Sequence, residues 1–216
     1  MILAVVLVAS AGCTRTHTAG SDAPATSAAT ASVDLSNVVV RPSDMPGWLQ
    51  IRAAGRETTI EKGQDKFVSS CMKGDYAGRS AYRGATLGYG KVPNQKQVQT
   101  IATEYRSPST AESIATSPNW APCSAASVHN QIATSPVFKL VGSVRASMRR
   151  VDLTHRVAIM RIYYQLTDGR LQLPFYNDVV LLWHGTVTAT LYLDSTREPF
   201  TASLEQHLIG VVEGRL

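Results

Sequence analysis

Apolar and polar residues alternate with a period of two over much of the last third of the chain. The apolar members of the pattern form three sets: Val144, Ala146 and Met148; Ala158, Met160, Ile162, Tyr164 and Leu166; and Val187, Ala189, Leu191 and Leu193. This period places alternate side chains on one face of a strand and indicates half-buried β-strands. Residues 179–183 (VVLLW) are continuously apolar, as in a central strand. We therefore predict four strands between residues 144 and 193.

Turn sequences separate these strands, and a helical pattern follows them. Asp168-Gly169 is a hairpin signal, and His184-Gly185 suits a tight turn. Residues 198–214 carry apolar side chains at helical spacing, preceded by a capping-box pattern, Ser195-x-x-Glu198. The class predicted is α+β: an antiparallel β-sheet meander flanked by helices, with the C-terminal helix packed on one face of the sheet.

The earlier part of the domain has shorter patterns. The elements predicted there are a strand or apolar plug at Val38–Val40, a helix near 65–72 that carries Cys71, a twisted strand in Ala81–Val92, a strand at 98–105, a helix that begins at Pro108 with Ser107 as its cap, and a helix at 124–132 after a loop at Trp120–Cys123. One or two strands and short helices thus precede the meander.

The N-terminus is an uncharged aliphatic run, Met1–Val8, followed by Ser10-Ala11-Gly12-Cys13. The run has the length of a signal-peptide core and is too short to span a bilayer as a helix. Because no positive residue precedes it, we expect the natural start to lie upstream. Small residues before a cysteine resemble the lipobox of bacterial lipoproteins. The resemblance implies that Cys13 carries a diacylglycerol group and becomes the first residue of the mature chain.

The domain organisation follows from this segment. We predict a lipoprotein signal peptide at 1–13, a flexible tether rich in Ser, Thr and Ala at 14–33, and a single globular α+β domain at 34–216. An alternative for the first segment is an ordinary signal peptide or a buried apolar strand. Lipid attachment would place the domain outside the cytoplasm, anchored to the cell membrane.

The chain has three cysteines. If Cys13 is acylated, Cys71 and Cys123 remain, and in an oxidising envelope such a pair most simply forms one disulfide. It would close a loop of about 53 residues and contribute about 4 kcal/mol in the chain-entropy model. The spacing has no CxxC element, so metal binding and redox activity are disfavoured.

Two sets of side chains are candidates for ligand binding. The net charge is +5, and the densest basic cluster comprises Arg145, Arg149, Arg150, Arg156 and Arg161. On neighbouring strands these arginines could share one face and receive an anion; the favoured alternative is a solvated face with scattered ion pairs. The aromatic candidates for an apolar cleft are Tyr163, Tyr164, Phe175, Tyr176 and Trp183. Core packing is the alternative for these rings.

Motifs for catalysis are weak. Ser70-Cys71-Met72-Lys73 matches the SxxK of penicillin-binding enzymes, but the KTG triplet that accompanies it is missing from the chain. The five histidines do not occur at metal-ligand spacings, and the carboxylates lie on different predicted elements. We expect no catalytic residues, no metal site and no cofactor.

The order of Cys71, Ala81-Tyr82, the segment 105–111 (YRSPSTA) and Trp120-Ala-Pro-Cys123 resembles mycobacterial and related actinobacterial cell-envelope lipoproteins. It is also similar to the extracellular sensor domains of mycobacterial serine/threonine kinases. The resemblance implies an antiparallel sheet flanked by helices, with a cleft that receives a ligand. A Mog1/PsbP-like lipoprotein domain resembles the last third of the chain.

From these observations we expect a non-enzymatic cell-envelope lipoprotein. Its exported domain would bind a ligand (lipid, glycan or peptide) or a partner protein, with the membrane as a partner through the N-terminal lipid. Nucleic acid is not an expected partner, because export separates the protein from it. The alternatives are a secreted hydrolase of unrecognised type and a scaffolding subunit of an envelope complex.

Overall fold

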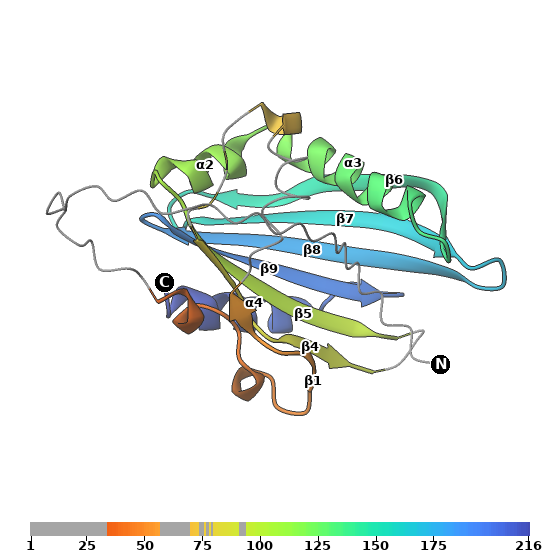
Figure 1. The fold of residues 1–216 in the computed structure, drawn as a ribbon, viewed down its shortest axis with the longest axis horizontal. Helices are drawn as coiled ribbons and strands as arrows, with labels where there is room; N and C mark the ends of the chain where they lie inside the picture. Colours follow the sequence, from red (N-terminus) through yellow and green to blue (C-terminus); the bar gives the residue numbers. More distant parts are fainter. Residues whose placement is uncertain (1–33, 57–69, 74–75, 77, 79, 91–93) are drawn as a thin grey trace, which may run out of the picture.

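The computed structural model describes residues 34–56, 70–73, 76, 78, 80–90 and 94–216. In this part of the chain, one antiparallel sheet of nine strands carries helices on both faces (Figure 1). The strands are β1 (Leu49–Arg52), β2 (Gly55–Arg56), β3 (Ser80–Arg83), β4 (Thr86–Tyr89), β5 (Lys96–Glu104), β6 (Lys139–Asp152), β7 (Val157–Thr167), β8 (Gln172–His184) and β9 (Val187–Thr196). Their order is β1-β4-β5-β9-β8-β7-β6, with β3 beside β5 and β2 beside β3. The predicted α+β class is confirmed.

Strands β6 to β9 form the predicted meander. Strands β7 and β8 pair without a break from Val157↔Leu182 to Thr167↔Gln172, and β8 pairs with β9 in the same way. Gly169 (φ 88°) and Gly185 (φ 57°) occupy the two predicted turns, where glycine accepts a positive φ at little energetic expense. The meander is therefore continuous, and β8 extends well beyond the apolar run that predicted it.

Strands β3 and β4 both pair with β5 and are separated by a short kink. Gly84 lies in the kink, where its N–H donates to the carbonyl of Thr100 at 2.8 Å. A Cβ atom at Gly84 would lie 2.9 Å from Cβ of Val39, so only glycine allows the N-terminal segment to pack this closely. Because the strands of this half are short and interrupted, their periodicity in the sequence is weak.

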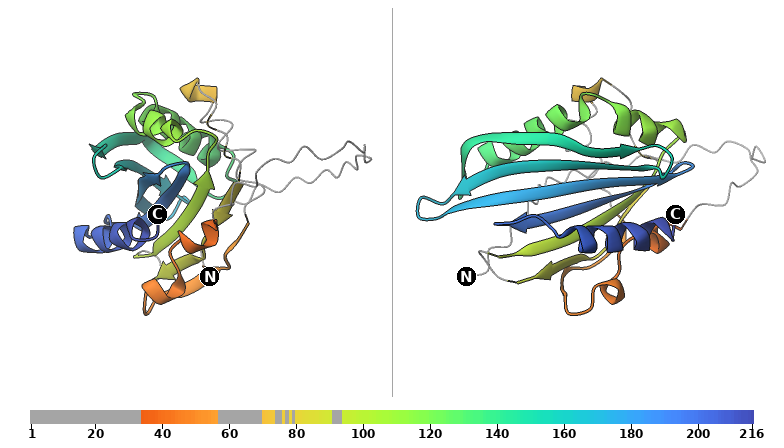
Figure 2. Two further views of the ribbon diagram at one scale, coloured as in Figure 1. Left: turned by 90° about the vertical axis from the view of Figure 1, so that its left-hand side faces the viewer. Right: turned by 180° about the vertical axis from the view of Figure 1, so that it is seen from behind.

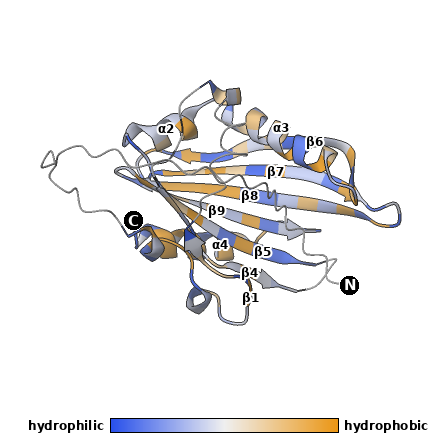
Figure 3. Ribbon diagram, in the orientation of Figure 1, coloured by the Kyte–Doolittle hydropathy of each residue, from blue (hydrophilic) through white to orange (hydrophobic). Residues whose placement is uncertain are grey.

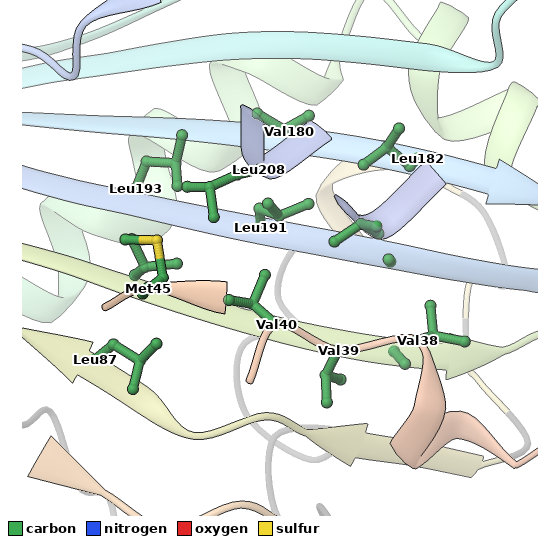
Figure 4. Packing of buried hydrophobic residues seen from close by; sticks show 14 of the residues in the cluster. Val38, Val39, Val40, Met45, Leu87, Val180, Leu182, Leu191, Leu193 and Leu208 are labelled. Atoms are coloured by element: carbon green, nitrogen blue, oxygen red, sulfur yellow. The ribbon is translucent and has the colours of Figure 1, made fainter. Parts of the chain in front are cut away.

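The C-terminal helix α4 (Ala202–Glu213) covers one face of the sheet, as predicted. Leu208 and Val212 of α4 are fully buried against a core that includes Leu191 and Leu193 of β9. The segment Val38–Val40, between the 3₁₀ helices η1 (Leu35–Asn37) and η2 (Pro42–Asp44), fills the same core as an irregular apolar plug (Figure 4). The plug alternative of the prediction is thus the correct one.

Helices α2 (Ser109–Thr116) and α3 (Trp120–Ala133) cover the opposite face (Figure 2). The apolar set of β7 predicted to face inward, which includes Met160 and Ile162, packs under these helices and not under α4. The intervening residues Val157 and Ile159 face the α4 core, so this part of β7 is buried on both sides. The prediction of a half-buried strand is therefore wrong for this part of β7. Figure 3 shows hydrophobic residues along the neighbouring central strands β8 and β9.

Two predicted boundaries differ from the structure. Trp120–Cys123 forms the first turn of α3 and not a loop, because Pro122 lies where a helix needs no N–H donor. Ser195 lies in β9, so the predicted capping box does not form, and α4 begins after Thr201. The helix predicted near 65–72 is described only at residues 70–72, where it is helical. No helix among the described residues is long and apolar enough to cross a membrane.

Candidate functional site

The predicted disulfide between Cys71 and Cys123 is present, with its two Cα atoms 5.7 Å apart. It joins the helical turn at residues 70–72 to the first turn of α3. Cys123 is buried beside Met72 and Trp120 in the core under α2 and α3. Cys71 lies inside the SxxK match, between Ser70 and Lys73. This part of the motif therefore belongs to a structural crosslink. Cys13, the predicted lipid attachment site, and the tether lie outside the described residues.

The five arginines of the predicted basic cluster do not form one site. Arg149 and Arg161 bind acidic side chains beneath α4, and Arg150 donates to Asp152 at the end of β6. Arg156 lies in the turn after β6, 2.9 Å from Nδ1 of His184. Arg145 is exposed near the middle of β6. These arginines therefore have different partners at different places on the sheet, and they do not converge on one anion site.

The charge network beneath α4 is a structural link between the helix and the sheet. Arg161 of β7 donates to both carboxylate oxygens of Asp178 on β8, at 2.7 and 2.8 Å. Arg149 of β6 donates to Glu205 in the first turn of α4 at 2.6 Å and lies 3.6 Å from Asp178. Asp178 is fully buried and Glu205 is nearly so. Buried carboxylates need such partners, so the network fixes α4 on the sheet.

The predicted aromatic cleft is divided between the two faces of the sheet. Tyr163 and Tyr176 are cross-strand neighbours on the α4 face, with ring centroids 5.1 Å apart. Tyr164 and Phe175 stack on the opposite face at 5.3 Å. Trp183 is buried in the core under α2 and α3, where it is a packing residue. The alternation along β7 and β8 explains the division, since adjacent residues of a strand point to opposite faces.

A second polar cluster, which no sequence pattern predicted, lies on the face of Tyr164 and Phe175. Asn177 of β8 and Asp194 of β9 are directly opposite each other, and the Asn177 amide donates to the Asp194 carboxyl group. Gln97 of β5 is the partner of Asp194 on the other side. Strand pairing therefore brings an amide, a carboxyl group and two stacked rings to one place. We call Tyr164, Phe175, Asn177 and Asp194 the Asp194 cluster.

The Asp194 cluster has more acceptors than donors. The Asn177 Oδ1 atom is buried and has no hydrogen-bond partner. Burial raises the pKa of Asp194 to about 6, the nearby charge of Asp178 acts in the same direction, and the Asn177 hydrogen bond offsets part of the rise. Burial and the Asp194 charge also raise the pKa of Tyr164. A buried acceptor without a donor is energetically unfavourable, which makes this cluster the best candidate for a ligand contact.

The histidines of the described chain are dispersed. His155 contacts Asp152 at 2.8 Å in the turn after β6, and His207 lies 3.3 Å from the carbonyl oxygen of Asp44. Both contacts are on the surface. Within the described ranges, no group of three His, Cys, Asp or Glu side chains has the arrangement of a metal site.

Comparisons with known proteins give two structural matches. No protein-family model matches the sequence, and no curated protein matches it. The structure of LpqN, described as involved in cell envelope biogenesis of Mycobacterium tuberculosis, is 9% identical, with 61% of this chain and 68% of that chain covered and a TM-score of 0.30. The extracellular domain of PknH from the same organism is 8% identical, with 77% and 80% covered and a TM-score of 0.38.

Both neighbours come from Mycobacterium tuberculosis; the description of one names cell envelope biogenesis and that of the other an extracellular domain. Scores of this size do not establish a common function. The function of this chain is therefore argued from its own residues.

Proposed function

We propose that this protein is a non-enzymatic cell-envelope lipoprotein whose domain binds a ligand outside the membrane. The N-terminal segment that ends at Cys13 supports export and lipid attachment. The Cys71–Cys123 disulfide is in keeping with an oxidising compartment. The Asp194 cluster supports the binding role, and its unpartnered Asn177 Oδ1 atom is the observation that carries it.

The ligand class follows from the acceptors of the cluster. Asn177 Oδ1 and the Asp194 carboxylate need hydroxyl or amine hydrogens, and the stacked rings of Tyr164 and Phe175 offer an apolar surface beside them. A glycan, a peptide or the polar part of a lipid combines such donors with apolar surface. The domain would hold the ligand by contacts on the sheet, with no covalent step.

Native mass spectrometry of the protein purified from its own membrane tests this role. We expect a bound ligand on the wild-type chain. The ligand should be lost from Asn177→Leu, which replaces the side-chain amide with an apolar group of similar volume. Gln172→Leu, an exposed residue on the same strand, is the matched control and should retain the ligand. Equal retention by both variants would exclude the Asp194 cluster as the binding site. Circular dichroism would show that both variants fold.

A further inference from the structure

A bulge in β6 opens a hollow on the α4 face of the sheet. The register between β6 and β7 jumps from Val141↔Gln165 to Arg145↔Tyr163, so residues 142–144 of β6 stand opposite the single residue Tyr164 of β7 and form a bulge. Gly142 makes the bend with a φ of 77°. The hollow has a volume of about 270 Å³ and is lined by Val141, Gly142, Ser143, Arg145, Tyr163 and Gln165.

The hollow lies beyond the part of this face that α4 covers. Arg145, Tyr163 and Tyr176 are opposite one another on successive strands, on the same face as Asp178. Helix α4 reaches β6 through the Glu205–Arg149 contact. Arg145 precedes Arg149 in β6 and lies farther from α4 along this strand. Figure 2 (right) shows the half of the sheet toward the β7–β8 hairpin extending past α4.

Four side chains that line the hollow carry hydrogen-bond donors, Ser143, Arg145, Tyr163 and Gln165, and none of the lining residues has a carboxylate. Gln165 Nε2 donates to the Tyr163 hydroxyl oxygen at 2.8 Å, so the Tyr163 hydrogen remains available to donate into the hollow. The Ser143 hydroxyl is a further donor. Tyr163 packs against Tyr176 at 5.1 Å between centroids, which fixes its position.

Arg145 differs from the arginines on either side of it. Arg149, Arg150 and Arg161 each bind a carboxylate. Arg145 has neither an ion pair nor a side-chain hydrogen bond to any residue that the structure describes. Arg145 is exposed and lines the hollow, and the chain has a net charge of +5. These features match an anion.

We propose that this hollow binds a phosphate group, with Arg145 as the charged donor and the Tyr163 and Ser143 hydroxyls as neutral donors. Donors from three side chains suit the several oxygens of a tetrahedral phosphate better than the two oxygens of a planar carboxylate. The phosphate can belong to a lipid headgroup or to a free ion. The inference goes beyond the proposed binding role, because this hollow lies on the opposite face of the sheet from the Asp194 cluster and would take a ligand class of its own.

Titration calorimetry with inorganic phosphate and glycerol phosphate tests the site, in full-length chains that carry Cys13→Ala so that no lipid is attached. Arg145→Gln should weaken binding of the phosphate group by about tenfold or more, because hydrogen bonds to charged groups are strong. Tyr163→Phe removes one neutral donor and should weaken binding about threefold to tenfold. Arg170→Gln, which removes the same charge in the β7–β8 turn, should change the affinity by less than about twofold.

Vesicles distinguish the two sources of the phosphate. If a lipid headgroup is the ligand, phosphatidylglycerol vesicles bind more tightly than glycerol phosphate, and Arg145→Gln abolishes the difference. If free phosphate is the ligand, inorganic phosphate binds, and the wild type and Arg145→Gln have the same affinity for the vesicles. The site is excluded if neither probe binds, or if Arg145→Gln and Arg170→Gln have equal effects. Either exclusion would leave anchoring through Cys13 and binding at the Asp194 cluster unaffected.

Discussion

The carboxyl group of Asp194 is held where the fold disfavours its charge. Its pKa is raised to about 6 from an ordinary value of 3.8, mainly by burial. The folded state therefore binds a proton more tightly than the unfolded state between these two values. The linkage relation then requires that stability falls as the pH rises from about 4 to about 6 and stays lower above that range.

Asp194→Asn should remove this pH dependence. The amide keeps an acceptor for Asn177 and carries no charge, so the variant should gain about 1–2 kcal/mol at pH 8 and have a flatter profile between pH 4 and 6. Urea unfolding at several pH values measures both effects. A variant that is less stable than the wild type at pH 8 would contradict the role assigned to burial.

Arg161→Ala should be strongly destabilising, because it leaves the fully buried Asp178 with only Arg149 at 3.6 Å. We expect a loss of about 3–5 kcal/mol in the free energy of unfolding at pH 7. Arg150→Ala removes a surface pair with Asp152 and should change stability by less than about 1 kcal/mol. Similar losses in the free energy of unfolding for the two variants would show that the buried ion pairs beneath α4 do not stabilise the fold more than a surface pair does.

At this scale the sequence predicted the cysteine pair but not the polar clusters. The Cys71–Cys123 pair follows from counting cysteines in a chain that is expected to be exported. Asn177 and Asp194 lie in alternating strand segments and meet only through the register of β8 against β9. That register depends on the length of the β8–β9 hairpin and on the faces buried, and no local signal marks the two residues.

Elements with long, regular patterns were predicted well, and interrupted ones were not. The 11-residue strand β7 and the 10-residue strand β9 have clear periodicity, and both were found close to their expected bounds. The strand predicted in Ala81–Val92 is divided at the Gly84 kink into β3 and β4, and β1 and β2, with 4 and 2 residues, have patterns too short to distinguish strand from loop. The start of α3 was placed too late because Pro122 was taken as a loop residue.

The N-terminal plug and the end of α4 are joined by one side chain. Arg215 donates to the Val39 carbonyl at 2.8 Å and to both carboxylate oxygens of Asp44, at 2.8 and 2.7 Å. These contacts tie the plug at Val38–Val40 to the C-terminal end of the chain. The link explains why the two ends of the described chain lie together in Figure 1.

Arg215→Ala should lower the free energy of unfolding by about 2 kcal/mol, since it removes the Arg215 donor from the Val39 carbonyl and leaves the half-buried Asp44 carboxylate with the Arg41 backbone N–H alone. Glu213→Ala, an exposed change in the last turn of α4, serves as the control and should have little effect. Thermal unfolding of the two variants compares them. Equal midpoints would show that the plug is held by its apolar contacts alone.

Across the whole molecule, two cores lie on opposite faces of one sheet. The core under α4 includes the plug, and the core under α2 and α3 includes the disulfide. The sequence predicted a helix on one face, because alternation identifies a buried face without showing whether the other face is also covered. The second core became evident only from the three-dimensional positions of α2 and α3.

The disulfide closes a loop across 52 positions of the sequence and so restricts the unfolded chain. The double variant Cys71→Ala/Cys123→Ala should lose about 4 kcal/mol, since the unfolded chain gains the freedom that the crosslink removes. Urea unfolding of the variant and of the reduced wild type should agree. A wild-type chain whose stability does not change on reduction would exclude this contribution.

The central claim, that the protein works at the membrane surface through a lipid on Cys13, has a direct test. Cell fractionation and intact mass measurement are applied to the wild-type chain and to Cys13→Ala in a bacterium that processes lipoproteins. We predict that the wild type is in the membrane fraction, begins at Cys13 and carries the mass of a diacylglycerol group. Cys13→Ala should leave the membrane fraction. A Cys13→Ala chain that stays in the membrane fraction, or a wild-type chain unmodified at Cys13, would contradict the account.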